Sequence, residues 1–293
     1  MSGKTARWSV GVSGGSLSHL TIPEIAATAV ALGTPSVELN WGQNFSSLAE
    51  AGEARRRLDA AGVAIPVTNT FMFRARAELD DPDGALATFA TCLDAARTLG
   101  SSRVLIYCPC SPRDLVPEAT HLAEVERFTA VLRRCADLCE AAGVTLVIEN
   151  HADWLLRSVD ETVRLLAAEP RLRMAFDPAN YYSSGEEAFP RAYGLLRDRV
   201  SVVHVKDPAR YDARLYPGER RTVERTVRGT LIKGLFLDLG EGAINWDGLL
   251  RRLSDDGFDG PLILEPYTEK PLLGESLSHA ADYLRRKAAA TGM

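Results

Sequence analysis

The sequence has no long hydrophobic run. No stretch approaches the roughly 18 consecutive apolar residues that a membrane helix needs. The first seven residues also lack the apolar core of a secretory signal peptide. We therefore expect a cytoplasmic protein that has no membrane partner.

Cysteine and histidine are scarce, with five residues of each in 293. An odd number of cysteines without an export signal argues for free thiols and against a disulfide framework. Cys108 and Cys110 are separated by one proline, and Cys135 and Cys139 lie one helical turn apart in a stretch rich in alanine and leucine. We interpret all four as buried or half-buried thiols and not as zinc ligands.

An excess of positive charge is also missing, because the formal net charge is −5. Phosphate binding requires a concentrated basic face, so the charge argues against a nucleic-acid partner. With 46% hydrophobic and 25% charged residues, the composition is that of an ordinary globular protein. No linker rich in glycine, serine or proline divides the chain, and we expect a single domain over residues 1–293.

What the sequence does contain is a repeated pattern of an apolar run followed by an ionisable residue. Such runs end at Glu149, Asp177, His204 and Glu265. A short, continuous apolar run is typical of a strand that is buried on both faces, as in a parallel sheet. Catalytic and binding groups collect at the C-terminal ends of parallel strands, so these four residues predict one shared site.

Eight strands of this kind alternate with eight helices along the chain. The strands are expected at about 8–12, 36–40, 63–69, 103–107, 145–149, 173–177, 200–204 and 262–265. The helices are expected at about 23–32, 47–61, 83–99, 118–142, 159–168, 186–198, 246–254 and 276–290. This alternation predicts a parallel sheet with right-handed crossovers, and eight strands favour a closed (β/α)8 TIM barrel, an α/β fold.

One connection, the insertion at about 208–239 that follows the seventh strand, is much longer than the others. It is polar and rich in arginine, and we expect it to be irregular. Irregular loops of this length are usually functional or mobile. The sequence is equally compatible with a loop that covers a substrate and with a solvated insertion or an oligomer contact.

Three carboxylates that converge without a cation would repel one another. A divalent metal ion removes this conflict. Ligation by several carboxylates and one imidazole suits Mn²⁺, Mg²⁺ or Co²⁺, and Zn²⁺ is also compatible. We therefore predict one divalent metal ion as the cofactor.

Five short motifs, in this order along the chain, resemble the xylose isomerase-like TIM-barrel superfamily. Within it they look most like the sugar phosphate isomerase/epimerase group. The motifs are VIENH at 147–151, FDPAN at 176–180, VHVKD at 203–207, GEGAINW at 240–246 and LEP at 264–266. The resemblance implies that Glu149, Asp177, His204 and Glu265 are the metal ligands. It also implies that Glu149 and Glu265 act as the acid/base pair on opposite faces of the substrate.

The function that follows is a metal-dependent isomerase or epimerase acting on a ketose, a ketose phosphate or a related polyol. A metal on the carbonyl acidifies the neighbouring C–H and stabilises an enediolate, and two carboxylates then remove and return the proton. Loss of a β-hydroxyl from the same intermediate gives the alternative, a dehydratase of an inosose or a dehydroshikimate-like acid. An endonuclease IV-type nuclease would need three zinc ions and more histidines than this chain offers. A non-catalytic binding barrel would bury three carboxylates without a compensating cation. The nuclease and the binding barrel are therefore both less favoured.

Six further residues are candidates for contact with a small-molecule substrate. Lys206 and Arg210 follow His204 closely, Asn180 stands where several members of the resembling family have a histidine, and His151, Glu38 and Trp154 lie at or near strand ends. A salt bridge is the alternative role for Lys206, simple solvent exposure for Arg210, orientation of Glu149 for His151, and structural roles for Glu38 and Trp154. The sequence is compatible with a homodimer or a homotetramer.

Overall fold

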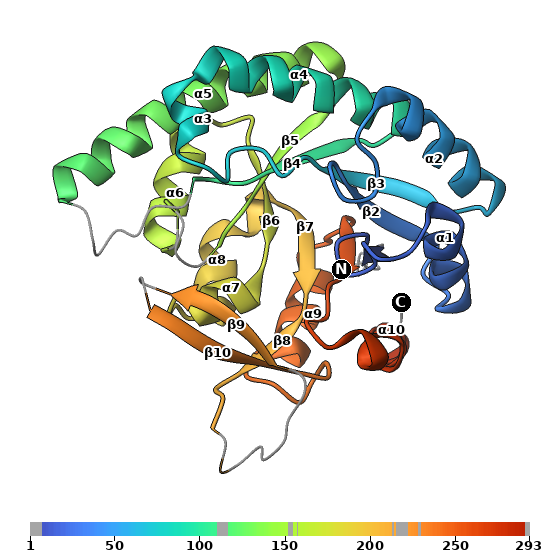
Figure 1. Cartoon of the computed structure of the whole chain (residues 1–293). Helices are drawn as coiled ribbons and strands as arrows, with labels where there is room; N and C mark the ends of the chain where they lie inside the picture. Colours follow the sequence, from blue (N-terminus) through green and yellow to red (C-terminus); the bar gives the residue numbers. More distant parts are fainter. Residues whose placement is uncertain are drawn as a thin grey trace.

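The structure is a computed structural model that describes residues 8–109, 117–151, 155–156, 158–212, 214, 222–227 and 230–290. Eight parallel strands close into a barrel in the order β1-β11-β7-β6-β5-β4-β3-β2 (Figure 1). They are β1 (Ser9–Ser13), β2 (Ser36–Asn40), β3 (Ala64–Asn69), β4 (Arg103–Ile106), β5 (Thr145–Glu149), β6 (Arg173–Phe176), β7 (Val200–Val205) and β11 (Pro261–Leu264). The predicted (β/α)8 barrel is confirmed, and every predicted strand is present.

The apolar runs form these strands because the barrel buries both of their faces. All residues of β2 and β11 are buried, as is β5 from Leu146 to Glu149. Parallel pairing sets Glu149 opposite Ala175 and His204 opposite Ile263. Because all eight strands run parallel, their C-terminal ends and the polar residues found there meet at one rim.

Helices surround the barrel on the outside (Figure 1). They are α1 (Ile22–Ala31), α2 (Leu48–Ala60), α3 (Ala77–Asp80), α4 (Pro82–Leu99), α5 (Glu118–Ala142), α6 (Val159–Ala168), α7 (Pro178–Ser183), α8 (Tyr193–Leu196), α9 (Trp246–Asp255) and α10 (Lys270–Ala290). Local signals explain several of the ends. Helix α5 stops at Gly143, whose φ of 66° is accessible to glycine at little cost, and Ser158 starts α6 with a capping box to Glu161.

The helix predicted at 186–198 is wrong as a continuous helix. A π-helical turn at Ala188–Ala192, the short α8 and a 3₁₀ turn at Arg197–Arg199 replace it, and Phe189 is extended at φ −143° and ψ 132°. Pro190 explains the break, because proline lacks the N–H that a helix interior needs. The prediction also missed α7, although Asp177 followed by Pro178 is a typical helix start.

The expectation of an irregular insertion is also wrong. The insertion contributes β8 (Asp207–Ala209), β9 (Thr222–Val227) and β10 (Thr230–Leu237), which form an antiparallel sheet in the order β8-β10-β9. This sheet lies to one side of the barrel, next to the end of β7 (Figure 1). The β-branched residues of segment 222–227 favour a strand, and the charged pair Glu224 and Arg225 between them hid that signal in the sequence.

Two predictions about absent features can be compared with the described part of the chain. None of its helices is long and apolar enough to span a membrane. The cysteines that it contains, Cys92, Cys108, Cys135 and Cys139, are buried thiols, as predicted. Cys110 lies outside the described residues.

Candidate metal centre

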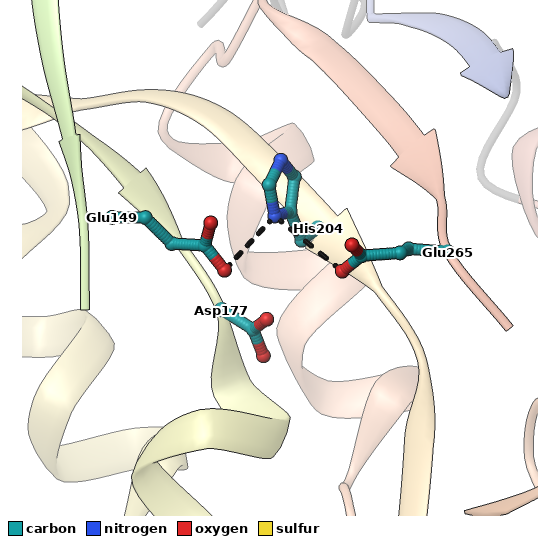
Figure 2. Close-up of side chains that lie close together, drawn as sticks. All are labelled: Glu149, Asp177, His204 and Glu265. Carbon is teal, nitrogen blue, oxygen red and sulfur yellow. Dashed lines mark ion pairs between the residues drawn. The ribbon is translucent and has the colours of Figure 1, made fainter. Parts of the chain in front are cut away.

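The barrel brings the four predicted ligands together. Glu149, Asp177, His204 and Glu265 each offer one ligand atom, and these atoms all lie within 4.8 Å of one another. They come from the ends of β5, β6, β7 and β11, and Figure 2 shows Glu149 and Glu265 on opposite sides of the His204 ring, with Asp177 below. Three of the four side chains are buried, whereas that of Glu265 remains 18% exposed. The centre is therefore enclosed by protein and open on the side of Glu265.

His204 is oriented by carboxylates on both ring nitrogens. Its Nε2 lies 3.2 Å from Glu38 Oε2, and its Nδ1 lies 3.2 Å from Glu149 Oε1. Despite that distance, Nδ1 has no well-formed hydrogen bond among the described residues, although it is buried. The arrangement fits an imidazole that donates Nε2–H to Glu38 and presents the Nδ1 lone pair to a cation. These residues therefore fit a divalent metal ion.

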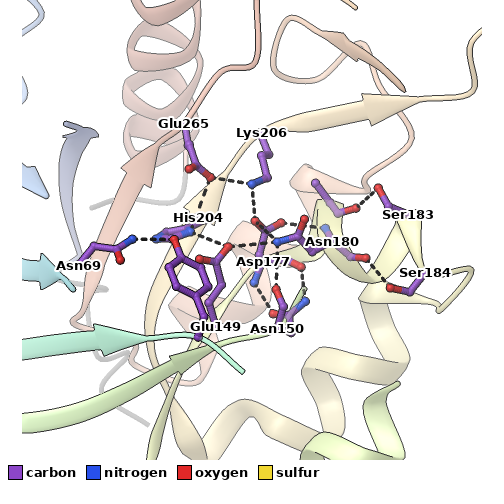
Figure 3. A network of polar contacts seen from close by, with 12 residues as sticks. Asn69, Glu149, Asn150, Asp177, Asn180, Ser183, Ser184, His204, Lys206 and Glu265 are labelled. Carbon is purple, nitrogen blue, oxygen red and sulfur yellow. Dashed lines mark hydrogen bonds and ion pairs between the residues drawn. The ribbon is translucent and has the colours of Figure 1, made fainter. Parts of the chain in front are cut away.

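Asp177 is held in place by two asparagines (Figure 3). The Asn150 side chain donates to the carbonyl of Asp177 and accepts from its N–H, both at 2.9 Å. Asn180 Nδ2 donates to Asp177 Oδ2 at 2.9 Å and to Glu149 Oε1 at 3.1 Å. Asn180 was a candidate substrate contact, and the structure places it behind two of the carboxylates, fully buried.

Lys206 directs its ammonium group at two of the three carboxylates among the predicted ligands. Its Nζ lies 2.6 Å from Asp177 Oδ2 and 2.6 Å from Glu265 Oε2, so the salt bridge considered from the sequence is present. Nζ also lies 4.7 Å from the centre of the Tyr267 ring, which stacks on Phe236 of β10 at 5.0 Å. The insertion sheet therefore packs directly against the residues that surround the centre.

The pKa values of two of the carboxylates shift in opposite directions. Burial raises the pKa of Glu149 to about 7, although nearby His204 and Lys206 oppose the rise. Burial also acts to raise the pKa of Asp177, but Lys206 and His204 outweigh it and hold that pKa below its ordinary value. Without a metal ion, the surroundings therefore shift the two pKa values apart, that of Glu149 upward and that of Asp177 downward.

A cavity of about 490 Å³ opens above the centre. Of the predicted site residues, Glu149, Glu265 and His151 line it. Glu38, Asn180 and Lys206 lie in the buried layer around the ligands, whereas Arg210 is exposed and is not among the described lining residues. Trp154 lies outside the described residues.

Sequence reasoning missed most of the cavity wall, including Phe71, Arg74 and Tyr107. They follow β3 and β4, whose expected ends carry no acidic or histidine residue to attract attention. Tyr107 is connected to the buried layer, because its hydroxyl accepts a hydrogen bond of 2.7 Å from Asn69. A search for polar and aromatic residues just beyond every strand end would have found all three.

Comparison with known proteins agrees with this architecture. The inosose dehydratase of Lacticaseibacillus casei is 24% identical over 144 residues, which are 48% of this chain and 47% of that protein. The inosose dehydratase of Geobacillus kaustophilus strain HTA426 is 25% identical over 173 residues, 55% of this chain and 54% of that protein. The chain thus matches about half the length of these curated relatives.

Solved structures match over almost the whole chain at low identity, which shows the fold. The IOLI protein with a bound zinc atom has a TM-score of 0.74 and 14% identity, covering 97% of this chain and 99% of that one. The probable 3-DHS dehydratase AsbF of Bacillus anthracis also has a TM-score of 0.74 and 14% identity, covering 94% and 98%.

The family model described as xylose isomerase-like TIM barrel matches residues 26–287, which is most of the chain. The protein therefore belongs to the xylose isomerase-like TIM barrel family.

Proposed function

We propose that this protein is a divalent-metal-dependent isomerase or epimerase that removes a proton next to the carbonyl of a sugar or polyol. The observation that carries the proposal is the environment of His204. Its Nε2 is directed at Glu38, while its buried Nδ1 faces the space between Glu149 and Glu265. A histidine held in this way beside three carboxylates is the arrangement of a metal ligand.

Glu149, Asp177, His204 and Glu265 would hold the ion. The donor set suits Mn²⁺, Mg²⁺ or Co²⁺, and the zinc in the similar IOLI protein keeps Zn²⁺ among the candidates. When bound, a divalent cation polarises the substrate carbonyl and stabilises the negative charge of the enediolate. The residues around it supply the proton transfer.

Glu149 is the base in this proposal. It lines the cavity, where its carboxylate can take a proton from a bound substrate and return it. Glu265 lines the same cavity from the other side of His204 (Figure 2). Carboxylates on two sides of a substrate can remove a proton from one face and return it to the other, which gives epimerisation or, at the next carbon, isomerisation.

A metal-dependent dehydratase is the second candidate, and the curated relatives favour it. Two inosose dehydratases match half of the chain, and dehydration begins with the same proton removal next to a carbonyl. The two functions differ in the next step, because a dehydratase expels a β-hydroxyl. In both versions of the proposal, His151, Arg210 and Trp154 are candidates for contact with the substrate.

The test incubates metal-loaded protein with ketoses, ketose phosphates, an inosose and dehydroshikimate in D2O and follows the products by NMR. Deuterium should enter the carbon next to the carbonyl, and only with metal. A vinyl signal identifies dehydration. Glu149→Gln should lower the exchange rate by about 10²- to 10⁴-fold, the usual contribution of a general base. Glu187→Gln, at an exposed position, should leave the rate unchanged.

Two results would contradict the proposal. One is the absence of exchange with every carbonyl compound in the panel, tested with each of the four metals. The other is an exchange rate in Glu149→Gln equal to that of the unmodified protein.

A further inference from the structure

One wall of the cavity carries a cation mounted on aromatic rings. The guanidinium carbon of Arg74 lies 5.0 Å from the centre of the Phe71 ring and 5.7 Å from that of Tyr107. The two rings lie 5.5 Å apart at 31° to each other. All three residues line the cavity above the metal centre. A guanidinium that lies over aromatic rings gains cation–π attraction and can still pair its N–H groups with an oxyanion.

The aromatic support links this cation to the metal centre. The Tyr107 hydroxyl accepts a hydrogen bond of 2.7 Å from Asn69, whose Nδ2 also lies 3.3 Å from Glu38 Oε1. Glu38 in turn contacts the ligand His204. Tyr107 thus has its hydroxyl in the layer behind the ligands, and Arg74 lies over its ring. A substrate whose carbonyl reaches Glu149 and Glu265 therefore has its remaining groups within the same cavity as Arg74.

The loop that presents Arg74 is fixed before any ligand arrives. Phe71 and Phe73 have positive φ values of 54° and 64°, which side chains larger than glycine adopt only when the surroundings enforce them. The Glu78 carboxylate accepts from the N–H groups of Phe73 and Ala75, both at 2.8 Å. Phe73 is fully buried. Preorganisation of this kind lowers the entropy cost of ligand binding.

The remaining charges of the wall favour an anionic substrate group. A divalent ion held by Glu149 and Glu265 would offset their negative charges. On the loop after β11, Glu269 and Lys270 contribute one charge of each sign to the lining. Arg74 adds a positive charge to the same lining, which an anionic group of the substrate would complement.

We infer that Arg74, on its support of Phe71 and Tyr107, binds a carboxylate or phosphate group of the substrate and so selects anionic substrates. This inference rests on the proposed function for the identity of the cavity as a substrate site. A bidentate guanidinium–oxyanion pair is the interaction that Arg74 supplies, and lysine does not reproduce its geometry.

The test uses probes that have no carbonyl and therefore cannot react. Quinate is compared with its uncharged methyl ester, and sorbitol 6-phosphate with sorbitol, by titration calorimetry on the metal-loaded protein. We expect one of the two anions to bind about 10- to 100-fold more tightly than its neutral partner, the range expected for a charge-assisted pair. Preference for quinate identifies a carboxylate substrate, and preference for sorbitol 6-phosphate identifies a phosphate.

Arg74→Gln should remove this preference while leaving the affinity for the neutral probe unchanged, and Arg74→Lys should restore only part of it. Arg76→Gln is the matched control, because Arg76 lies on the same loop but pairs with Glu124 outside the cavity wall. Equal affinity for charged and neutral probes overturns the inference. So does an anion preference that survives Arg74→Gln, or the absence of saturable binding of either anion. None of these probes requires turnover, so the binding result holds even if the proposed reaction is not observed. Failure of the inference and failure of the proposed function can therefore be told apart.

Discussion

Glu38 and His204 are 166 residues apart in the sequence, yet a contact of 3.2 Å joins them in the structure. The contact gives Glu38 a defined role, because an acceptor on Nε2 keeps the Nδ1 lone pair free to bind a metal. From the sequence, Glu38 was a candidate for substrate contact or a structural residue. Its burial behind the ligand histidine favours orientation of that histidine.

Glu38→Gln should therefore weaken metal binding. The amide oxygen still accepts a hydrogen bond, but the negative charge that makes the imidazole a better ligand is lost. We expect a dissociation constant about tenfold higher, at the lower end of the effect of such supporting residues. Titration calorimetry with Mn²⁺ measures it, and Glu126→Gln at an exposed position of α5 is the control. An unchanged dissociation constant would assign Glu38 another role.

The convergence of the four candidate ligands was predictable from the sequence, because each of them ends an apolar run typical of a buried strand. The residues that hold these side chains in place were harder to predict. Asn180 lies three residues from Asp177, within reach of a local argument, whereas the pairing of Tyr107 with Asn69 joins residues on neighbouring strand ends whose side-chain directions the sequence does not specify.

Among the elements, the segment at 240–246 owes its shape to Asp207, the first residue of β8. Asp207 Oδ2 accepts from the N–H groups of Gly240 at 2.8 Å and Gly242 at 3.1 Å, and Oδ1 accepts from Ile244 at 3.1 Å. A Cβ on Gly242 would lie 2.2 Å from Asp207 Oδ1, so the close approach requires glycine. This explains why a Gly-x-Gly pattern occurs there.

Asp207→Asn should destabilise the protein. An asparagine can orient only one oxygen toward the three N–H groups, and its amide N–H₂ would face donors. We expect a loss of about 1–3 kcal/mol in the free energy of unfolding, the usual effect of leaving a buried group unsatisfied. Urea denaturation measures the loss, with the exposed Asp255→Asn as the control. Equal midpoints for the two variants would show that the carboxylate does not hold the segment.

Elements with strong periodicity were predicted well, and elements that depend on a few residues were not. The 25 residues of α5 match the prediction from its apolar spacing and from Gly143. The insertion strands β9 and β10 were missed because their alternation is short and interrupted by charges. The break at Phe189 and Pro190 was missed because the surrounding composition favours a helix.

For the molecule as a whole, the barrel follows from the repeated strand and helix pattern, and the match of the family model to residues 26–287 supports it. The pattern also indicates that all strand ends share one rim. It does not indicate which residues meet across the barrel, since that depends on register and side-chain direction. The contact of Glu38 with His204 and the packing of Arg74 on Tyr107 depend on register and side-chain direction, so the sequence pattern did not predict them.

The pH dependence of stability is a property of the whole molecule. Burial in the folded protein raises the pKa of Glu149 to about 7. The carboxylates of Glu149 and Glu38 outweigh the opposing effect of burial on His204 and raise the pKa of its imidazole well above the usual value. Both groups thus bind protons more tightly when folded. Their stabilising contribution is present at low pH and is lost as the pH rises through these raised pKa values.

Metal binding should reverse this trend, because only the deprotonated carboxylate and the neutral imidazole are ligands. We expect the metal-free protein to melt at a lower temperature at about pH 8 than at about pH 6, and metal to stabilise it more at the higher pH. At 100 times the dissociation constant, the ion should add about 2.7 kcal/mol. Thermal denaturation with Mn²⁺ or with a chelator checks this, and a metal effect that is equal at both pH values would contradict it.

The most direct test of the account is the number of metal ions that the chain binds. Calorimetric titration of chelator-treated protein with Mn²⁺, followed by elemental analysis after desalting, should give one ion per chain. Asp177→Asn and His204→Gln should each abolish this binding while the fold, checked by circular dichroism, persists. A protein that binds no divalent ion, or variants that bind it as tightly as the unmodified chain, would contradict the assignment of this metal centre.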